Sequence, residues 1–279
     1  MKSRYRPLSN KIVEVLLILL TIATHWIVYY FIFINACKSK AEAARLSLAL
    51  PTQWQLFENL KYVWDYNNHV FVRAFLNSAT ITIVSVAMLV FAASMTAFVL
   101  QRRGGRLTSA SDKLVLAGLM TPLSVVPTFW VLKTLHLSGT LPGLILVEVA
   151  IHFSVSVMLY KGFLASVPRE IDEAAIVDGC GSWRLYWNII FPLVKPITAT
   201  VIILRSTIIY NDFSNPMYFL SGSRSATVQL CIYTFQSAFT TDWGHLFAAI
   251  LFISLPPLLL FLCLNKKIMQ SVTMGAVKG

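Results

Sequence analysis

The chain is 279 residues long, 57% hydrophobic and only 13% charged, with a mean hydropathy of +0.69. These values exclude an ordinary water-soluble globular protein and are typical of an integral membrane protein. The net charge of +11 is spread over several short loops, which argues against a nucleic-acid-binding patch and favours basic residues that set membrane topology.

Six segments are long and apolar enough to cross a bilayer, because about 20 mostly apolar residues span its hydrocarbon core. The first follows basic residues, as a signal peptide does, but its apolar stretch is long and lacks a small-x-small cleavage site, so we expect it to be retained. We predict an all-α membrane protein with six transmembrane helices, forming a single domain over residues 1–279. The six segments are residues 12–36, 74–101, 114–133, 140–166, 194–220 and 244–265.

Lysine and arginine residues are concentrated in alternate connections. Fifteen lie before the first span, between the second and third, between the fourth and fifth, and after the sixth, whereas seven lie on the other side. Because basic loops face the cytoplasm, both termini are predicted to be cytoplasmic. Segment 37–73 is then external, and its polar and aromatic composition predicts that it lies across the membrane surface.

Proline interrupts several of the predicted spans, including Pro122 in the third and the pair Pro256 and Pro257 in the sixth. Proline removes a backbone donor and kinks a helix, which membranes tolerate where neighbouring helices satisfy the freed carbonyls. We therefore expect a bundle of bent helices. No internal repeat is evident in the sequence, so the inverted-repeat architecture of many secondary transporters is not supported.

Residues 168–192 form a charged, amphipathic stretch between the fourth and fifth predicted spans. Pro168 favours a break after the fourth span and suits the first turn of a new helix, which we place at about 168–178. Charged residues cover most of this helix. Its small apolar face, suited to close approach by another surface, consists of Ile171, Ala174 and Ala175.

A tight turn and a second helix are predicted to follow. Gly179 fits a helix C-cap because glycine adopts the left-handed conformation at no steric cost, and Ser182 fits the N-cap of the next helix. Pro192 should stop that helix before the fifth span. Four side chains on one of its faces form a candidate anchor against the spans or the lipid headgroups: Trp183, Tyr186, Trp187 and Ile190.

This stretch resembles the EAA loop of ABC importer permeases, whose pattern is Glu-Ala-Ala, three residues, Gly, nine residues, then Ile-x-Leu-Pro. Phe191 replaces the usual Leu and keeps the position large and apolar. The matching residues are Glu173-Ala174-Ala175, Gly179 and Ile189-Ile190-Phe191-Pro192. Further segments are similar to carbohydrate-importer permeases related to the smaller membrane subunit of the maltose transporter: Phe75-Leu76-Asn77-Ser78, Arg102-Arg103, Met120-Thr121-Pro122, Leu141-Pro142-Gly143-Leu144 and Gly275-Ala276-Val277-Lys278-Gly279.

The resemblance implies a type I ABC importer permease in a bacterial or archaeal cytoplasmic membrane. The implied partners are a second, homologous permease subunit, two copies of a cytoplasmic ATPase and an external sugar-binding protein. The resemblance further implies that the loop at about 167–193 inserts into the ATPase through Glu173, Ala174, Ala175, Asp178, Gly179, Ile189 and Pro192. It also implies that the C-terminal tail reaches the ATPase through Gly275, Lys278 and Gly279.

The chain lacks the Gly-x-x-x-x-Gly-Lys-Ser/Thr phosphate-binding loop, so it is not expected to hydrolyse nucleotide by that mechanism. We predict that it is not an enzyme and binds no cofactor, and that ATP and Mg²⁺ enter through the partner ATPase. The four cysteines and five histidines show no paired spacing, so neither a metal site nor a disulfide framework is indicated.

Charged residues inside the predicted spans are costly and are expected to be functional. Arg205 lies about 15 Å deep on entering from residue 195, close to the membrane midplane. One hypothesis is that a polar set lines the sugar path; the alternative is an ion pair between Glu148 and Arg205 that only joins two helices. His152 shares a helical face with Glu148, and Asp212 shares one with Arg205. The set consists of Glu148, Arg205, Tyr210, Asn211 and Asp212.

We therefore predict a permease subunit of a binding-protein-dependent carbohydrate ABC importer that works by alternating access. The alternative from another class is an ion-coupled secondary transporter, in which Glu148 or Asp212 would carry a proton. An intramembrane enzyme is a third class, but the histidines and carboxylates offer no motif for it.

Overall fold

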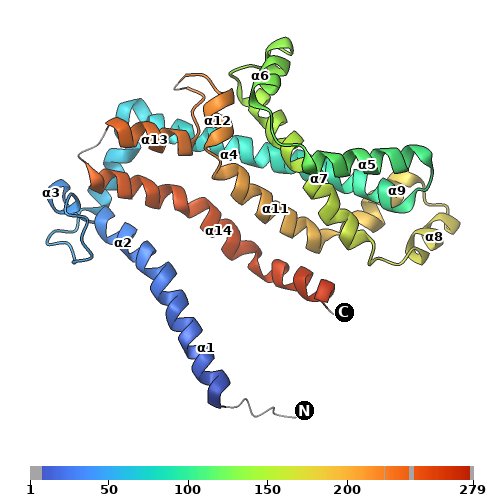
Figure 1. Ribbon diagram of the computed structural model, residues 1–279, viewed down its shortest axis with the longest axis horizontal. Helices are drawn as coiled ribbons and strands as arrows, with labels where there is room; N and C mark the ends of the chain where they lie inside the picture. Colours follow the sequence, from blue (N-terminus) through green and yellow to red (C-terminus); the bar gives the residue numbers. More distant parts are fainter. Residues whose placement is uncertain (1–7, 223, 239–241, 277–279) are drawn as a thin grey trace. The chain divides into compact units, whose positions relative to one another are not determined.

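The computed structural model describes residues 8–222, 224–238 and 242–276 (Figure 1). Within those ranges the regular elements are helices, and no β-strand is formed. Two of the helical segments, η1 and η2, are π-helical. The elements are α1 (Leu8–Thr21), η1 (Ile22–Trp26), α2 (Ile27–Ala36), α3 (Lys40–Ala43), α4 (Leu56–Arg102), α5 (Arg106–Met120), α6 (Val125–Thr134), α7 (Leu141–Leu164), α8 (Glu170–Val177), α9 (Ser182–Leu185), η2 (Tyr186–Ile190), α10 (Phe191–Leu193), α11 (Lys195–Tyr210), α12 (Ser214–Phe219), α13 (Val228–Ala238) and α14 (Trp243–Ala276).

In the described residues, four helical stretches are long and apolar enough to cross a membrane: Val13–Ala36, Asn68–Arg102, Leu141–Leu164 and Trp243–Cys263. A fifth candidate consists of two helical pieces, Ser182–Leu193 and Lys195–Tyr210, which meet at an angle of 73°. The predicted all-α class with several membrane-crossing helices is thus confirmed for the part of the chain that the structure describes.

The predicted third span, 114–133, is not one continuous helix. α5 ends at Met120 and α6 begins at Val125. Thr121 between them is extended, with φ −83° and ψ 113°. The residue before a proline is driven out of the helical region, so Pro122 accounts for the break. The predicted fifth span, 194–220, also ends early, since α11 stops at Tyr210 and the chain turns before α12.

The chain divides into two compact units. The first contains residues 1–71 and 231–255, and the second contains residues 72–230 and 256–279. The loop between α7 and α11 and all the charged residues predicted in the fourth and fifth spans belong to the second unit. The candidate functional residues therefore lie mainly in that unit.

A buried lysine organises the chain just after α2 in the first unit. Lys38 is 1% exposed, and its Nζ atom donates to Asn35 Oδ1 at 3.1 Å and to the Ser47 carbonyl oxygen at 2.6 Å. Asn59 Nδ2 donates to the carbonyl oxygens of Ala36 and Lys38. Burial lowers the pKa of the Lys38 amine. The start of the predicted external segment is therefore held by hydrogen bonds to its backbone as well as by packing.

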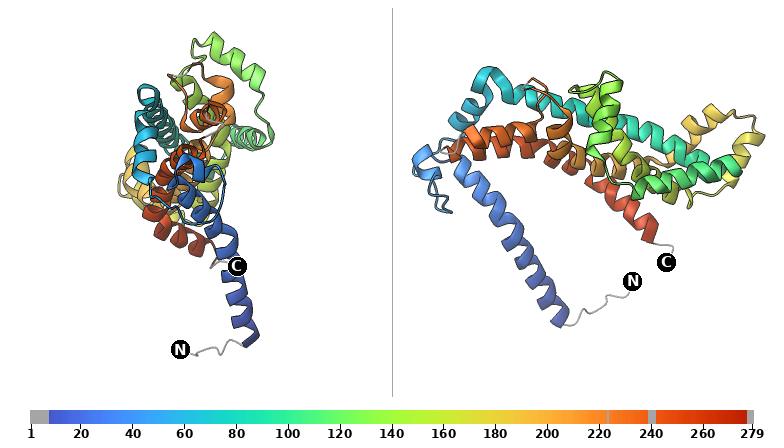
Figure 2. Two further views of the ribbon diagram at one scale, coloured as in Figure 1. Left: turned by 90° about the vertical axis from the view of Figure 1, so that its left-hand side faces the viewer. Right: turned by 45° about the horizontal axis from the view of Figure 1, so that its top comes forward.

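The core of the second unit is built around α7, which packs against α5, α11 and α12 (Figure 2). Val157 and Tyr160 on α7 are fully buried, and the Tyr160 hydroxyl donates to Thr198 Oγ1 at 3.0 Å. Ala93 and Ala97 on α4 are also fully buried in this cluster. Small residues allow helices in a membrane to approach closely, which explains how α4 fits beside this core.

The start of α7 gives a test of this packing. A Cβ atom at Gly143 would overlap the backbone carbonyl of Leu137, whereas a Cβ atom at Gly162 in the same helix meets nothing within 4 Å. Gly143→Ala should destabilise the protein by about 1–3 kcal/mol through overpacking. Gly162→Ala should be neutral or stabilising, because alanine favours a helix. Thermal melting of the two purified variants in detergent measures the difference, and equal melting temperatures would contradict this account of the α7 start.

Candidate functional site

The loop that follows α7 folds as a short helix and a tight turn. α8 spans Glu170–Val177, close to the predicted 168–178. Gly179 adopts the left-handed conformation with φ +78°. Its amide donates to the Ile176 carbonyl oxygen at 3.0 Å, and the Cys180 amide donates to the Ala175 carbonyl oxygen at 2.9 Å. These are the two hydrogen bonds of a Schellman motif, so the predicted helix C-cap at Gly179 is confirmed.

The faces of α8 differ from the prediction. Asp172 and Ala175 turn inward and are each 7% exposed, whereas Ile171 is 36% exposed and Ala174 is exposed. The predicted apolar face of Ile171, Ala174 and Ala175 is therefore wrong, because its members point to different sides. The sequence pattern did not indicate that a charged residue, Asp172, lies on the buried side of α8.

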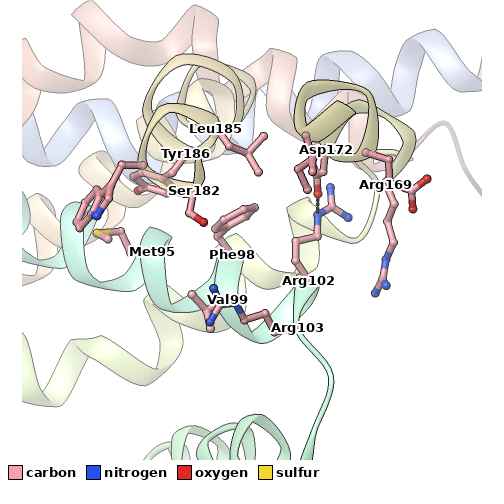
Figure 3. A pocket seen from close by; sticks show the side chains of 13 residues that line it. Met95, Phe98, Val99, Arg102, Arg103, Arg169, Asp172, Ser182, Leu185 and Tyr186 are labelled. Carbon is pink, nitrogen blue, oxygen red and sulfur yellow. Dashed lines mark ion pairs between the residues drawn. The ribbon is translucent and has the colours of Figure 1, made fainter. Parts of the chain in front are cut away.

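Three side chains attach α8 to the end of α4, and we call Arg102, Arg169 and Asp172 the clasp (Figure 3). Arg102 Nε lies 2.6 Å from Asp172 Oδ2, with both side chains about nine-tenths buried. Arg102 Nη2 donates to the Val167 carbonyl oxygen at 3.1 Å, and Arg169 Nη2 donates to the Gln101 carbonyl oxygen at 3.0 Å. Each arginine thus reaches from one segment to the backbone of the other.

Burial raises the pKa of the Asp172 carboxyl, and the positive charge of Arg102 opposes this rise. The carboxylate therefore depends on Arg102 to keep its charge in a site that water hardly reaches. A hollow of about 510 Å³ lies beside the clasp. Figure 3 shows Phe98 and Tyr186 on its α4 and η2 sides.

The helix after the turn is anchored partly as predicted. Tyr186 and Ile190 are buried, and the Tyr186 hydroxyl lies 2.6 Å from Ser94 Oγ on α4. Trp187 stacks on Phe91, with ring centroids 5.9 Å apart. Trp183, by contrast, is 65% exposed. The π-helical turn η2 changes the angular spacing, so the four predicted residues do not share one face.

Two further details of this segment correct the sequence analysis. Ser182 is the first residue of α9, and Gly181 occupies the N-cap position without a side-chain hydrogen bond. Pro192 does not end the helix, because it lies at the start of α10, a position that needs no amide donor. The break falls after α10, at Val194.

The remaining residues of the predicted coupling set lie on the outside of the loop. Glu173, Ala174, Asp178 and Gly179 are exposed, as is Pro192. Two large apolar neighbours are exposed with them, Ile176 at 59% and Val177 at 86%. Ile189 is half-buried. Gly275 lies near the end of α14, and the other predicted tail residues, Lys278 and Gly279, lie outside the described residues.

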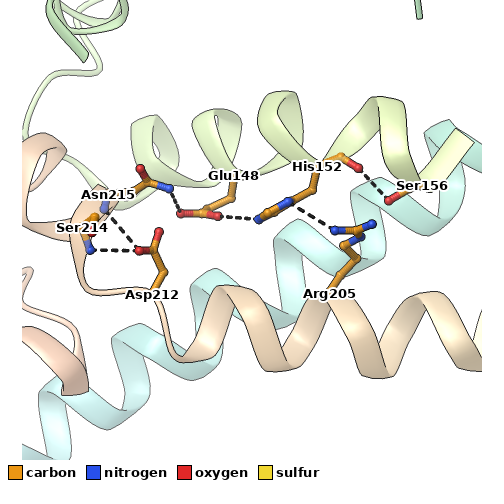
Figure 4. Close-up of polar contacts among 7 residues, drawn as sticks. All are labelled: Glu148, His152, Ser156, Arg205, Asp212, Ser214 and Asn215. Carbon is orange, nitrogen blue, oxygen red and sulfur yellow. Dashed lines mark hydrogen bonds and ion pairs between the residues drawn. The ribbon is translucent and has the colours of Figure 1, made fainter. Parts of the chain in front are cut away.

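Four polar side chains form a chain of contacts between α7, α11 and α12 (Figure 4). Asn215 Nδ2 donates to Glu148 Oε1 at 3.0 Å. Glu148 Oε2 lies 3.4 Å from His152 Nε2, and Arg205 Nη1 lies 3.5 Å from His152 Nδ1. Glu148 is 1% exposed and Arg205 is 5% exposed. We call these four residues the polar network.

The polar network replaces the predicted direct ion pair between Glu148 and Arg205 with a bridge through His152. Arginine can only donate, so His152 Nδ1 must accept and the imidazole proton resides on Nε2, facing Glu148. The i, i+4 spacing of Glu148 and His152 is the sequence signal for this arrangement. Nothing in the helical pattern indicated Asn215, because it lies beyond the end of α11.

The other predicted path residues lie at the end of α11. Asp212 follows the helix and does not share a helical face with Arg205; its Oδ1 atom accepts from the Ser214 amide at 2.9 Å. Asn211 Nδ2 donates to the Thr207 carbonyl oxygen at 2.9 Å. Tyr210 is 6% exposed, and its hydroxyl has no hydrogen-bond partner. Asp212 Oδ1 also accepts from the Asn215 amide at 3.4 Å, so Asp212 adjoins the polar network, whereas the Tyr210 hydroxyl is separate from it.

No group of three metal-ligating side chains comes together among the residues that the structure describes. A short helix with an exposed face of acidic and small residues, attached firmly to a membrane-crossing helix, suits a contact with another protein. Taken with several membrane-crossing helices and a buried polar network, these features fit a membrane transport component.

Comparison with known proteins identifies the class. Residues 4–273 match the family described as "Binding-protein-dependent transport system inner membrane component", and the chain belongs to that family. It is therefore a transport subunit in the membrane, and this assignment decides against the ion-coupled secondary transporter and the intramembrane enzyme.

Particular relatives are similar along most of their length. The chain is 31% identical over 252 residues to a probable starch degradation products transport system permease protein, AmyC, of Thermoanaerobacterium thermosulfurigenes, covering 90% of each chain. It is 30% identical to the melibiose/raffinose/stachyose import permease protein MelC of Bacillus subtilis, covering 98% of this chain and 99% of MelC. A chain of a bacterial ABC transporter involved in alginate import has the same fold, with a TM-score of 0.78 at 19% identity, over 96% of this chain and 99% of that one.

The clasp gives a prediction about stability and pH. Arg102→Met should leave the Asp172 carboxylate buried without its partner, at a cost of about 3–5 kcal/mol at neutral pH. Without Arg102, the pKa of Asp172 should rise further, so the folded state binds a proton more readily than the unfolded state. Stability then falls as pH rises, and the loss in the variant should shrink as pH is lowered.

Thermal melting of Arg102→Met from pH 5 to pH 8 measures this effect. The matched control is Arg103→Met, which removes the adjacent arginine and leaves the clasp intact. A loss of stability in Arg102→Met that is the same at every pH would contradict the role assigned to Asp172.

Proposed function

We propose that the chain is the transmembrane permease subunit of an ATP-driven ABC importer that passes a di- or oligosaccharide into the cytoplasm by alternating access. The match to the binding-protein-dependent transport family along residues 4–273 is the observation that carries this proposal. The sugar class is supported by relatives named for starch degradation products and for melibiose, raffinose and stachyose. An external sugar-binding protein would deliver the ligand.

We propose six membrane spans with both termini in the cytoplasm of a bacterial or archaeal cell. The four long stretches and the bent piece at α9–α11 would supply five of them. The broken pair α5 and α6 would supply the sixth, because the two helices contain 15 and 10 residues. At 1.5 Å per residue their combined rise is about 38 Å, which exceeds the roughly 30 Å thickness of the hydrocarbon core. The two compact units would act together as one permease domain over residues 1–279.

The loop at about 167–193 would couple this chain to a homodimeric cytoplasmic ATPase. The exposed face of α8, with Glu173, Ala174 and Asp178, has the small and acidic residues that a cleft on another protein can receive. The clasp would carry a displacement of α8 to the end of α4, since it bonds to the backbone on both sides. ATP and Mg²⁺ would bind to the ATPase, and this chain would bind no cofactor. Gly275, Lys278 and Gly279 would meet the same partner.

The pore would lie between this chain and a second, homologous permease subunit. We propose that the polar network borders the sugar path. Its support is that Arg205 Nε is buried without a hydrogen-bond partner, although Nη1 of the same guanidinium lies 3.5 Å from His152 Nδ1. A network that served only to join helices would gain by satisfying this donor, whereas a hydroxyl-rich ligand would supply the missing acceptor in a state of the transport cycle that opens the network.

Glu173→Lys tests the coupling role. The variant should lose the ATP hydrolysis that loaded binding protein stimulates, because a positive charge replaces an acidic contact on the docking face. The measurement is ATPase activity in proteoliposomes containing this chain, its permease partner and the ATPase. Glu58→Lys makes the same charge change at an exposed site in α4 and should behave as the native protein. An ATPase that neither copurifies with the native chain nor responds to binding protein would overturn the proposed function.

Glu148→Gln and Arg205→Met test the path. Each should lower the initial rate of sugar uptake about ten-fold, equivalent to about 1.4 kcal/mol, while the complex still assembles. Assembly is followed by copurification of the ATPase and partner permease. Lys133→Met, which removes an exposed charge in the last turn of α6, serves as the control. Native uptake rates in both normally assembled variants would leave the polar network with a helix-joining role only.

A further inference from the structure

The hollow beside the clasp has an apolar end and a basic end. Its volume is about 510 Å³, and we call it the clasp hollow. Figure 3 shows Met95 and Tyr186 at one end and Arg102 and Arg169 at the other. A third arginine of the lining, Arg103, follows directly at the end of α4. A site with these two ends suits a molecule that is itself apolar at one end and negatively charged at the other.

Two of the three arginines in the clasp hollow are accessible and carry a charge that the chain does not neutralise. Arg102 is paired with Asp172. Arg103 is exposed, and its side chain forms no ion pair or hydrogen bond with the residues that the structure describes. Arg169 is also exposed and bonds only to a backbone carbonyl oxygen. The remaining carboxylate of the lining belongs to Glu173, so three arginines stand against two carboxylates and the lining is positive.

The apolar end of the clasp hollow lies within the membrane-crossing part of α4. Met95 and Val99 belong to the stretch Asn68–Arg102, which is long and apolar enough to cross a membrane. Met95 precedes Arg102 by seven residues, so it lies about 10 Å farther along the helix. Arginine at the end of such a helix reaches the headgroup region while the preceding turns stay in hydrocarbon. A soluble partner such as an ATPase can reach the arginines but not this apolar end, whereas an acyl chain can occupy it.

Apolar surface continues on the other side of Arg103. A second hollow of about 360 Å³ is lined by α4 and α5 and shares Met95, Val99 and Arg103 with the clasp hollow. On the α5 side it is lined by Leu107, which is 83% exposed. Trp183 borders the clasp hollow and is 65% exposed, as aromatic side chains at a membrane interface often are. Arg103 thus has apolar grooves on both sides, which can hold the two acyl chains of one phospholipid.

We infer that the clasp hollow binds an anionic phospholipid of the cytoplasmic leaflet, with its phosphate at Arg103 and Arg169 and an acyl chain along Met95 and Val99. Basic pockets beside membrane helices on the cytoplasmic side are typical sites for anionic headgroups. A free phosphate would leave the apolar end empty, and a zwitterionic lipid would bring a cation toward the arginines. The inference concerns a ligand other than the transported sugar, and it rests on the proposed function only for the side of the membrane. The bound lipid would attach the coupling loop to the bilayer.

The test measures lipid binding to the purified complex of this chain, its permease partner and the ATPase in a neutral detergent. Dioctanoyl phosphatidylglycerol, dioctanoyl phosphatidylcholine and glycerol 3-phosphate are added separately, and native mass spectrometry gives the dissociation constant of each. The native complex should bind phosphatidylglycerol at least about ten-fold more tightly than phosphatidylcholine. Arg103→Gln should weaken phosphatidylglycerol binding about ten-fold, because a charge-assisted contact with the phosphate is lost. Its melting temperature without lipid should equal that of the native complex, because the Arg103 side chain has no partner in the described chain.

Arg106→Gln is the matched control, because it removes an exposed arginine three residues farther on that lines neither hollow. It should bind phosphatidylglycerol as the native complex does, and lipid sites on the partner subunits are the same in both variants. Equal affinity for the two lipids would overturn the inference, as would native affinity in Arg103→Gln.

Three further results would also overturn the inference. An equal loss in Arg103→Gln and Arg106→Gln would show diffuse attraction to a basic surface. Binding of glycerol 3-phosphate as tight as that of the lipid would show a site for free phosphate. Loss of the ATPase from the Arg103→Gln complex without lipid would assign this arginine to the protein contact. Failure of the proposed function is distinct, since the native complex itself would then not assemble or would show no stimulated ATP hydrolysis.

Discussion

The contact between Arg102 and Asp172 is the constraint on which the geometry of the loop depends. α8 is only eight residues long, too short to be stable alone, and its inward stripe consists of Asp172 and Ala175. The ion pair and two arginine-to-carbonyl bonds supply what an apolar face would otherwise provide. Such a buried pair adds little net stability over apolar packing, but breaking it is expensive, so it fixes orientation more than it adds strength.

The sequence predicted the helical class, the loop helix and its glycine cap, because each depends on local rules. Hydrophobic length identifies the membrane-crossing helices, and the left-handed conformation at Gly179 follows from the chemistry of glycine. The loop family was recognisable from the spacing of Glu173, Gly179 and Pro192. These features involve residues close together in the chain.

The sequence predictions that the structure changes concern mostly side chains whose partners lie far away in the chain. Helical periodicity placed Asp172 outward, but its pairing with Arg102, seventy residues earlier, turned it inward. The third span was expected to bend at Pro122, and the structure goes further, because the extended Thr121 divides the span into two separate helices. Glu148 and Arg205, which one of the two alternatives paired directly, are instead bridged by His152. The sequence pattern placed His152 beside Glu148 on one helix, but it did not show which residue of another helix the imidazole would meet.

The clasp has a consequence for how related sequences diverge. Its two arginines are bonded to the main-chain oxygens of Val167 and Gln101, which any residue at those positions would supply. Substitutions at these two sites can accumulate without loss of the bonds, whereas Arg102 and Asp172 can change safely only together. Comparison of homologous sequences would then detect one covarying pair and miss two of the three attachments, so the mechanical link would look weaker in an alignment than it is in the folded protein.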